Sequence, residues 1–201
     1  MSRTLSHDHE LQRERILNLA AEKFAQTSYA NTSMTDLAIA SGASKARFYH
    51  YYSGKDAILF DLLDRYTARL VDITDEVDRK CVSRGLNECD TLAELIRAFL
   101  AEYEKSHSRH VALVNDLKYL GELERNVILD RQRAIVANFR EKIRAAYPER
   151  VSVSNQTTIT MMVFGMINWT FTWLKPDGEL RYSGLAEEVI SFLDHGLRGR
   201  G

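Results

Sequence analysis

Residues 32–59 read TSMTDLAIASGASKARFYHYYSGKDAIL, a pattern that predicts two short helices joined by a tight glycine turn. Ser33 and Asp36 have the spacing of a capping box, in which a hydroxyl and a carboxylate satisfy the free amides at the start of a helix. Gly42 is suited to end that helix. A second helix is then expected from Ser44 to about Tyr51.

The two predicted helices have an apolar side and a polar side. We expect the inward-facing residues to be Leu37, Ala38, Ala43, Phe48 and Tyr52. The residues that then face outward on the second helix are Lys45, Ala46, Arg47, Tyr49 and His50. Such a surface is suited to the DNA major groove, where cations meet phosphates or guanine edges, although the same residues could form an ordinary solvated face. Residues at helix starts that could hold phosphates are Ser33, Thr35, Ser44 and Lys55.

Helical periodicity extends on both sides of this stretch. Before it, an apolar stripe from Ile16 to Phe24 predicts a helix over residues 10–27. After it, apolar residues recur at steps of three and four from Leu59 to Val77, which predicts one helix of about 25 residues. A polar loop is expected at 83–90. Beyond it, one helix is expected to start at the Thr91–Glu94 capping pair, and further helices are expected over 109–119, 122–147, 155–174 and 184–197.

Residues 155–174 are apolar on almost every side. A membrane span needs about 20 consecutive apolar residues, and Thr157, Thr158, Thr160 and Asn168 interrupt this segment. We therefore expect a helix buried on all sides of a larger bundle and no membrane contact. The last two helices carry more apolar surface than one partner covers, so we expect them to pair with the same helices of a second copy of the chain.

The composition is typical of a soluble helical protein of one or two domains. The chain has 201 residues, of which 45% are hydrophobic, and only 2 prolines, which excludes a disordered chain and disfavours a β-sandwich. The 2 cysteines are too few for a disulfide scaffold, and we expect a cytoplasmic location. The net charge is −1 overall, +2 over residues 1–55 and −3 over residues 56–201, so DNA contact is expected of the amino-terminal part.

The opening stretch resembles the DNA-binding head of the tetracycline-repressor (TetR) family. That family pattern has a Thr, a short helix with Ile-Ala-x-x-Ala-Gly, then Val-Ser-x-Gly, Tyr-x-Tyr-Phe and a Lys before an apolar pair. The corresponding positions here are Thr32, Leu37-Ala38, Ser41-Gly42, Ala43-Ser44, Ala46, Tyr49-His50-Tyr51-Tyr52, Lys55 and Ile58-Leu59. The departures are mild and fall at Leu37, Ser41, Ala43, Ala46 and Tyr52. Of these, Ala46 adds a methyl group where the family has a glycine facing DNA.

The resemblance implies an all-α protein with a three-helix helix-turn-helix head at residues 1–54 and a helical ligand-binding and dimerisation body at 55–201. It implies a homodimer that places the third helix of each head in one half of a palindromic operator. The expected DNA-binding residues are Thr32, Ser33, Thr35, Ser44, Lys45, Ala46, Arg47, Tyr49, His50 and Lys55. Most members are repressors released by a small molecule, and we expect no catalytic site, metal or cofactor.

The segment from Phe164 to Gly178 resembles a subgroup of the family that regulates the breakdown of fatty acids, sterol fragments or phenylacetate and responds to acyl-CoA thioesters. This implies an acyl-CoA effector, although a stripe of methionine and aromatic residues is also typical of a core or a dimer seam, and a different hydrophobic ligand stays open. The expected ligand-binding residues are Phe99, Tyr103, Leu117, Phe139, Met161, Phe164, Asn168, Trp169 and Trp173. The cations available for the CoA phosphates, which could equally form a solvated face, are Arg109, Lys118, Arg131 and Arg133.

Other functional classes have less support. An enzyme is disfavoured because the sequence lacks a nucleophile elbow, a phosphate-binding loop, a dinucleotide fingerprint and a paired zinc motif. Glu104 and His107 have the spacing found in di-iron bundles, but such sites need two copies, and a surface pair is the simpler interpretation. His7 and His9 could bind a metal ion as a tail, but a disordered amino terminus is the simpler interpretation. A thiol switch that uses the two cysteines, and a helical adaptor without DNA binding, stay open.

Overall fold

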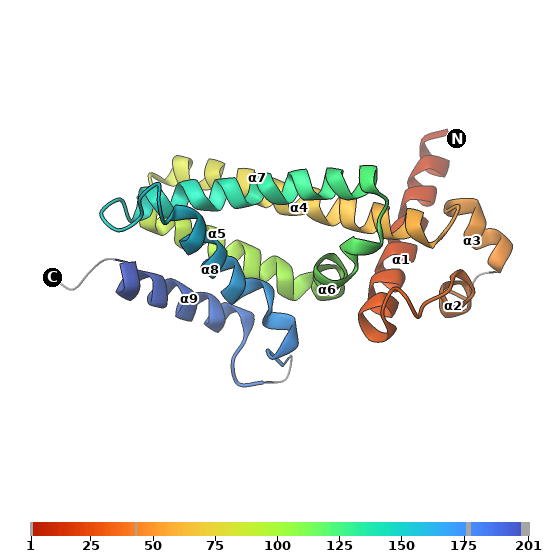
Figure 1. The fold of residues 1–201 in the computed structure, drawn as a ribbon. Coiled ribbons are helices and arrows are strands. Elements are labelled where there is room, and N and C mark those ends of the chain that lie inside the picture. Colours follow the sequence, from red (N-terminus) through yellow and green to blue (C-terminus); the bar gives the residue numbers. More distant parts are fainter. Residues whose placement is uncertain (1, 43, 176–177, 198–201) are drawn as a thin grey trace. The chain divides into compact units, whose positions relative to one another are not determined.

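The computed structural model describes residues 2–42, 44–175 and 178–197, apart from the side chains of residues 2–6 and 47. Within these ranges every regular element is a helix (Figure 1), which confirms the all-α fold class. The elements are α1 (Ser2–Thr27), α2 (Met34–Ala40), α3 (Lys45–Tyr51), α4 (Lys55–Arg84), α5 (Glu88–Lys105), α6 (His107–Asp116), the 3-10 turn η1 (Leu117–Tyr119), α7 (Glu122–Ala146), α8 (Gln156–Asn168), the 3-10 turn η2 (Thr170–Thr172) and α9 (Tyr182–Leu197).

The predicted capping box and glycine turn are both confirmed. The Ser33 hydroxyl accepts a hydrogen bond from the Asp36 amide at 3.1 Å, and the Asp36 carboxylate accepts one from the Ser33 amide at 2.8 Å. Gly42 follows α2 with a φ of 64°, in the left-handed region that glycine adopts without a Cβ penalty. Residues 33–51 therefore fold as the helix, turn and helix that local sequence signals predict.

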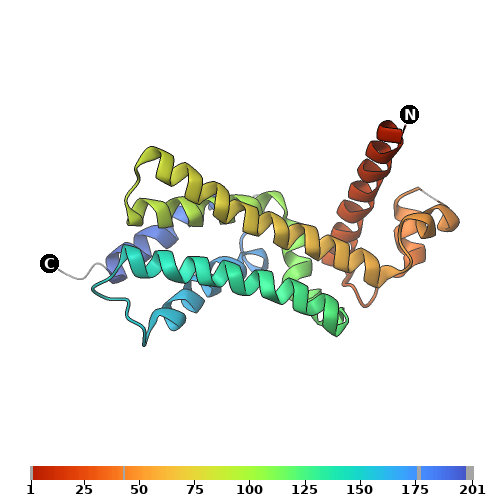
Figure 2. The same cartoon turned by 90° about the horizontal axis from the view of Figure 1, so that it is seen from above.

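The chain divides into two compact units. The head unit comprises the described residues up to Tyr66 together with Ser108–Leu129, and the body unit comprises Thr67–His107 together with the described residues from Asp130 onwards. Two long helices, α4 and α7, contribute residues to both units, and α4 is uninterrupted over its whole length (Figure 2). The functional boundary between residues 54 and 55 stays a prediction, because the compact units divide the chain differently.

Apolar packing holds the short helices of the head unit. Leu37, Ala38, Phe48 and Tyr52 are each at most 4% exposed, as predicted, while the predicted partner Ala43 lies outside the described residues. α2 packs against both α1 and α3. The first helix begins at Ser2 rather than near residue 10, so the amino terminus is not the disordered tail that its polar sequence suggests.

The body unit is built around an aromatic cluster. The Phe139 ring lies 4.8 Å from the Phe99 ring and 4.8 Å from the Phe164 ring, which brings α7, α5 and α8 together. α5 and α9 pack side by side (Figure 1), and Arg97 of α5 donates hydrogen bonds of 2.6 and 2.8 Å to both carboxylate oxygens of Glu187 on α9.

The predicted start of α5 is wrong. The helix begins at Glu88, and the Asn87 side chain caps it by accepting a hydrogen bond from the Asp90 amide at 2.9 Å. Thr91, the predicted cap, lies inside the first turn, where its hydroxyl donates to the Asn87 carbonyl at 2.9 Å. Several residues in this stretch can cap a helix, and Asn87 is the one whose side chain accepts a hydrogen bond from a free amide of the first turn.

The prediction of one helix over residues 155–174 is wrong in its extent. α8 ends at Asn168, and Met161, Met162 and Trp169 are 53%, 59% and 53% exposed. The segment therefore has one buried face and one apolar face that a single copy of the chain leaves uncovered. Among the described residues, no helix is both long and apolar enough to cross a bilayer.

Candidate functional site

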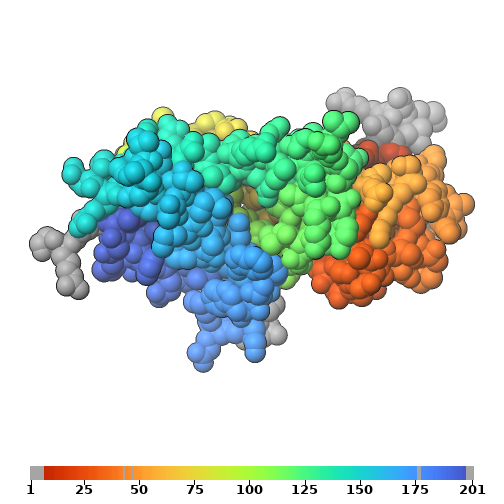
Figure 3. All heavy atoms as spheres, viewed as in Figure 1, coloured from red at the N-terminus to blue at the C-terminus, as the bar shows by residue number. Residues whose placement is uncertain are grey.

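The outer surface of α3 carries most of the residues that the sequence singles out. Lys45, Ala46, Tyr49 and His50 are exposed, as predicted, and Phe48 between them is 1% exposed. The Lys45 ammonium lies 6.0 Å from the centre of the Tyr49 ring. The side chain of Arg47 lies outside the described residues. In Figure 3 the orange atoms of α2 and α3 form part of the molecular surface.

The start of α2 places Ser33 and Thr35 at the surface as well. The Ser33 hydroxyl donates to the Asp36 carboxylate at 2.7 Å, and this bond together with the Ser33 amide lowers the pKa of Asp36. The ionised Asp36 carboxylate thus already lies at the start of α2, and the Ser33 hydroxyl is engaged in the capping box. Ser44 is exposed at the start of α3, where its carbonyl accepts from the Phe48 amide at 3.1 Å.

Thr32 and Lys55 do not lie on this surface as phosphate-binding groups, which corrects the prediction. Thr32 is 3% exposed and its hydroxyl donates to the Ser28 carbonyl at 2.8 Å. The Lys55 ammonium donates to the backbone carbonyls of Tyr29 and Thr32 at 2.7 and 2.8 Å and lies 4.1 Å from the centre of the Tyr29 ring. Both residues instead fix the chain between α1 and α2.

A charged network behind α3 fixes its orientation. Tyr52, directly after α3, donates its hydroxyl proton to Asp61 of α4 at 2.5 Å, and Arg13 of α1 donates to the same carboxylate oxygen at 2.7 Å. Arg65 donates to the other oxygen at 2.8 Å. Burial raises the pKa of Asp61, but the hydrogen bonds from Tyr52 and Arg65 outweigh it and hold that pKa below its ordinary value. The carboxylate is therefore charged at neutral pH and joins three elements.

Sequence reasoning missed one residue that touches α3. The His9 ring of α1 lies 4.9 Å from the Tyr51 ring and 6.3 Å from the His50 ring. No local signal points to this cluster, because 41 residues separate His9 from its partner His50. A helix that begins at Ser2 places His9 beside the end of α3.

Five of the nine expected ligand-binding residues lie together in the body unit. Phe99, Phe139 and Phe164 form the aromatic cluster, and Tyr103 extends it with its ring 6.0 Å from Phe99. The Tyr103 hydroxyl donates to the Asn168 side-chain oxygen at 2.9 Å, and burial raises the pKa of that hydroxyl. The cluster combines a packed apolar wall with one part-buried polar pair.

The other four expected residues lie outside this cluster, and their role stays a prediction. Leu117 belongs to the head unit. Met161, Trp169 and Trp173 are more than half exposed. Trp173 lines an open apolar groove of about 390 Å³ between α8 and α9, whose other lining residues are Gly165, Met166, Leu185, Glu188, Val189 and Phe192.

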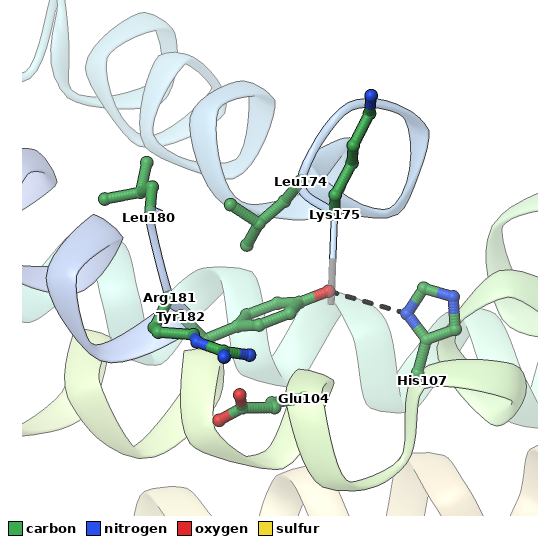
Figure 4. Close-up of a pocket in the computed structure, with 7 residues that line it drawn as sticks. All are labelled: Glu104, His107, Leu174, Lys175, Leu180, Arg181 and Tyr182. Carbon is green, nitrogen blue, oxygen red and sulfur yellow. Dashed lines mark hydrogen bonds between the residues drawn. The ribbon is translucent and has the colours of Figure 1, made fainter. Parts of the chain in front are cut away.

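A smaller cavity of about 150 Å³ lies in the body unit next to the end of α5 (Figure 4). Tyr182 crosses it with its hydroxyl 3.5 Å from the Nδ1 atom of His107, and Glu104 lies on the opposite side of the Tyr182 ring from Leu174. The sequence pair Glu104 and His107 therefore shares a cavity wall with Tyr182. Among the described residues, no group of three or more His, Cys, Asp or Glu side chains is placed to hold a metal ion.

The cations proposed for CoA phosphates have other partners. In the head unit, Arg109 donates to Glu14 and, at 2.7 Å, to Asn18, and Lys118 lies 5.3 Å from the Tyr119 ring. In the body unit, Arg131 donates to the Thr67 hydroxyl at 3.3 Å, and exposed Arg133 donates to Asp130 at 2.6 Å. The predicted set of four is thus divided between two units.

Comparison with known proteins gives matches along most of the chain. The family model described as "Bacterial regulatory proteins, tetR family" matches residues 16–62, and "Tetracyclin repressor-like, C-terminal domain" matches residues 85–197. A TetR-family transcriptional regulator from Bordetella parapertussis is 33% identical, with a TM-score of 0.83 over 94% of this chain and 97% of that one.

Two further relatives cover similar shares of the chain. The HTH-type transcriptional repressor KstR2 of Rhodococcus jostii is 24% identical over 191 residues, which is 92% of this chain and 90% of KstR2. AibR, solved in complex with isovaleryl coenzyme A and operator DNA, has the same fold, with a TM-score of 0.72 and 22% identity over 90% of this chain and 96% of AibR.

Two lysines of the head unit should differ sharply in their contribution to stability. Lys55→Met leaves two carbonyls without their cationic donor and should lower the free energy of unfolding by about 1–3 kcal/mol. Lys45→Met replaces an exposed side chain and should change the free energy of unfolding by less than about 0.5 kcal/mol. Urea denaturation of both variants checks this. Equal effects of the two substitutions would contradict the structural role of Lys55.

Proposed function

Because the chain belongs to the TetR family of bacterial transcriptional regulators, we propose that it is a repressor that binds a palindromic operator as a homodimer, with α3 of each copy in the major groove of one half-site. Residues 1–54 are the DNA-binding head, and residues 55–201 bind the effector and the second copy. The observation that carries this proposal is the exposed face of α3, where Lys45 and Tyr49 flank the buried Phe48. Eight of the ten expected DNA-binding residues are proposed, because Thr32 and Lys55 are engaged within the head unit: Ser33, Thr35, Ser44, Lys45, Ala46, Arg47, Tyr49 and His50.

The homodimer forms through α8 and α9. The groove between these helices is lined mostly by apolar side chains, with the charged Glu188 among them, and its lining residues Trp173 and Phe192 are 51% and 63% exposed. A stable dimer buries about 1,600 Å² of surface. The groove and its exposed apolar side chains are the part of the body that such an interface would cover. Two heads must then match half-sites one turn of DNA apart, or a multiple of about 34–36 Å.

The effector is an acyl-CoA thioester. The body segment around Asn168 and Trp169 resembles acyl-CoA-responsive regulators, and AibR, with the same fold, has been solved with isovaleryl coenzyme A. Sites for ligands of this size have volumes of about 300–1,000 Å³, so the cavity of about 150 Å³ at Tyr182 is too small. The acyl chain instead separates the Phe99, Phe139 and Phe164 rings, and the Tyr103–Asn168 pair provides the polar contact.

Release from DNA follows from the need to separate the three phenylalanine rings. A ligand that binds only when the aromatic cluster opens has different affinities for two states of the body, and this difference shifts the equilibrium between them. The Phe139 ring belongs to α7 and packs on α5 and α8, so opening the cluster displaces at least one of these helices. α4 runs from the head unit into the body unit and carries the change to the heads.

Substitutions on α3 should reveal the phosphate and base contacts. Lys45→Gln should weaken operator binding and reduce the slope of log affinity against log salt by about one, because one phosphate-bound cation is lost. Tyr49→Ala should weaken binding about tenfold or more at one salt concentration. Fluorescence anisotropy on a duplex selected by the wild-type protein from a random pool measures both. Lys105→Gln, an exposed lysine of α5, is the matched control; an unchanged salt slope for Lys45→Gln would contradict the proposal.

Phe192→Arg should dissociate the homodimer, since it places a charge in the apolar groove of both copies. The dissociation constant of the dimer should rise by about 100-fold or more, measured by analytical ultracentrifugation. Val153→Arg introduces the same charge at a residue that is 79% exposed and outside the groove, and it should leave the dimer intact. A Phe192→Arg variant that dimerises like the wild type would contradict the assigned interface.

An acyl-CoA should raise the melting temperature of the protein and release it from the operator. At a ligand concentration about 100 times its Kd, the stabilisation is about 2.7 kcal/mol. A thermal-shift series with isovaleryl-CoA and longer acyl-CoAs measures this, with coenzyme A and the free acids as controls. Stabilisation and DNA release by a free acid alone would identify a different hydrophobic effector, and no response to any thioester would contradict the acyl-CoA proposal.

A further inference from the structure

A series of charged side chains within the head unit continues from Asp61 to the start of α6. Asp61, which accepts the hydroxyl proton of Tyr52 directly after α3, also accepts a hydrogen bond from Arg65 at 2.8 Å. The Nη1 atom of Arg65 lies 3.6 Å from one carboxylate oxygen of Glu14 on α1. The other oxygen of Glu14 accepts a hydrogen bond from Arg109, the third residue of α6. Ion pairs thus connect α6, α1 and α4 to the residue that follows α3.

This set of residues, the α6–α3 network, alternates in charge. Its members are Arg109, Glu14, Arg65, Asp61 and Tyr52. Each carboxylate lies between two cations, because Arg13 also donates to Asp61, at 2.7 Å. A displacement of one member therefore disturbs the pairing of its neighbours, which fixes the geometry better than an isolated surface pair does. All members belong to the head unit, although 95 residues separate Arg109 from Glu14.

Arg109 lies against α1 along one helical turn. Its side chain is 15% exposed, and the Nη2 atom that donates to Glu14 also donates to the Asn18 side-chain oxygen at 2.7 Å. Glu14 and Asn18 are four residues apart and therefore share a face of α1. The outer end of the network is thus fixed to α1 at two points.

The network contributes more to direction than to stability. The side chains of Glu14 and Arg65 are 41% and 30% exposed, and ion pairs open to solvent add little to the free energy of unfolding. Buried residues such as Leu37 and Phe48 hold the short helices together. α3 has only seven residues, and the Tyr52 hydroxyl at its end binds a carboxylate of the network. The orientation of α3 therefore depends on where the network holds that carboxylate.

We propose that Arg109 is a positioning residue for operator binding: the network that it ends fixes Tyr52, and with it the direction in which α3 presents its exposed face. Without the Arg109 cation, Glu14 draws Arg65 toward itself. The hydrogen bond from Arg65 to Asp61 then weakens, and Tyr52 loses part of its fixed position. Operator binding has to restore that position, and this ordering lowers the affinity. The inference rests on the proposed function, since it concerns binding to an operator.

The test measures operator affinity and its salt dependence for Arg109→Gln, by fluorescence anisotropy on a duplex that the wild-type protein selects from a random pool. We expect the Kd to rise about threefold or more. The slope of log affinity against log salt should stay that of the wild type, because no phosphate contact is lost. Arg97→Gln removes an arginine from an ion pair between two helices of the body unit, and this matched control should leave both quantities unchanged.

A double-mutant cycle tests whether the effect passes through the network. Tyr52→Phe removes the hydroxyl that binds Asp61, and it should also weaken operator binding. Because both substitutions break the same network, Arg109→Gln should add little to the loss caused by Tyr52→Phe, whereas the effects of independent sites add. Affinities are taken at a temperature at which circular dichroism shows every variant to be folded.

Glu14→Gln breaks the network from α1 and should give the same loss of affinity and the same unchanged salt slope as Arg109→Gln. If Arg109→Gln fails to fold, Glu14→Gln takes its place in the cycle with Tyr52→Phe.

An affinity equal to that of the wild type would overturn the positioning role of Arg109. A salt slope reduced by about one would also overturn it, because Arg109 would then be a direct phosphate ligand. So would losses that add in the double variant. These outcomes leave wild-type operator binding intact, and they are therefore distinct from failure of the proposed function. In that case the wild-type protein itself would select no duplex.

Discussion

A helix of seven residues is too short to hold its conformation in water, and α3 therefore depends on the buried contacts behind it. Phe48 anchors its inner face in the head core. Tyr52, directly after the helix, is tied to Asp61, which also accepts a hydrogen bond from Arg13. The exposed side chains of α3 owe their common direction to this buried carboxylate and ring. The geometry of the proposed DNA-binding surface is thus decided by contacts on the opposite, buried side of the helix.

The body presents the opposite arrangement, with a filled interior and an incompletely covered exterior. Phe99, Phe139 and Phe164 pack at ring distances of 4.8 Å, which leaves an effector no preformed space among them. Trp173 and Phe192 remain exposed beside an apolar groove. In the proposed mechanism a ligand enters only after the rings have separated, and it therefore has unequal affinities for the closed and open states of the body.

The features that the sequence predicts correctly depend on neighbours within a few residues. The capping box of Ser33 and Asp36, the turn at Gly42 and the burial of Phe48 follow from spacing alone. Roles set by distant segments could not be found in this way. Lys55 has the sequence position of a phosphate ligand, but the nearest acceptors of its ammonium are two carbonyls more than 20 residues earlier in the chain.

The same limit explains the errors in the body. An apolar segment such as residues 155–174 carries no sequence signal for which of its faces its own chain covers or where its helix ends, and the structure leaves Met161 and Trp169 exposed. Near α5, Asn87 and Thr91 are both able to cap a helix, and only the packing of the first turn distinguishes them. Periodicity identifies that a helix exists better than it identifies where the helix ends.

Stability and function make different demands on the head unit. Asp61 receives enough hydrogen bonds to remain charged in spite of burial, so its charge contributes to holding the fold together. Lys55 likewise contributes to holding the fold together, because its ammonium donates to the Tyr29 and Thr32 carbonyls. Lys45, by contrast, is exposed on α3. The contrast between these two lysines separates a side chain that builds the head from one that the fold leaves at the surface.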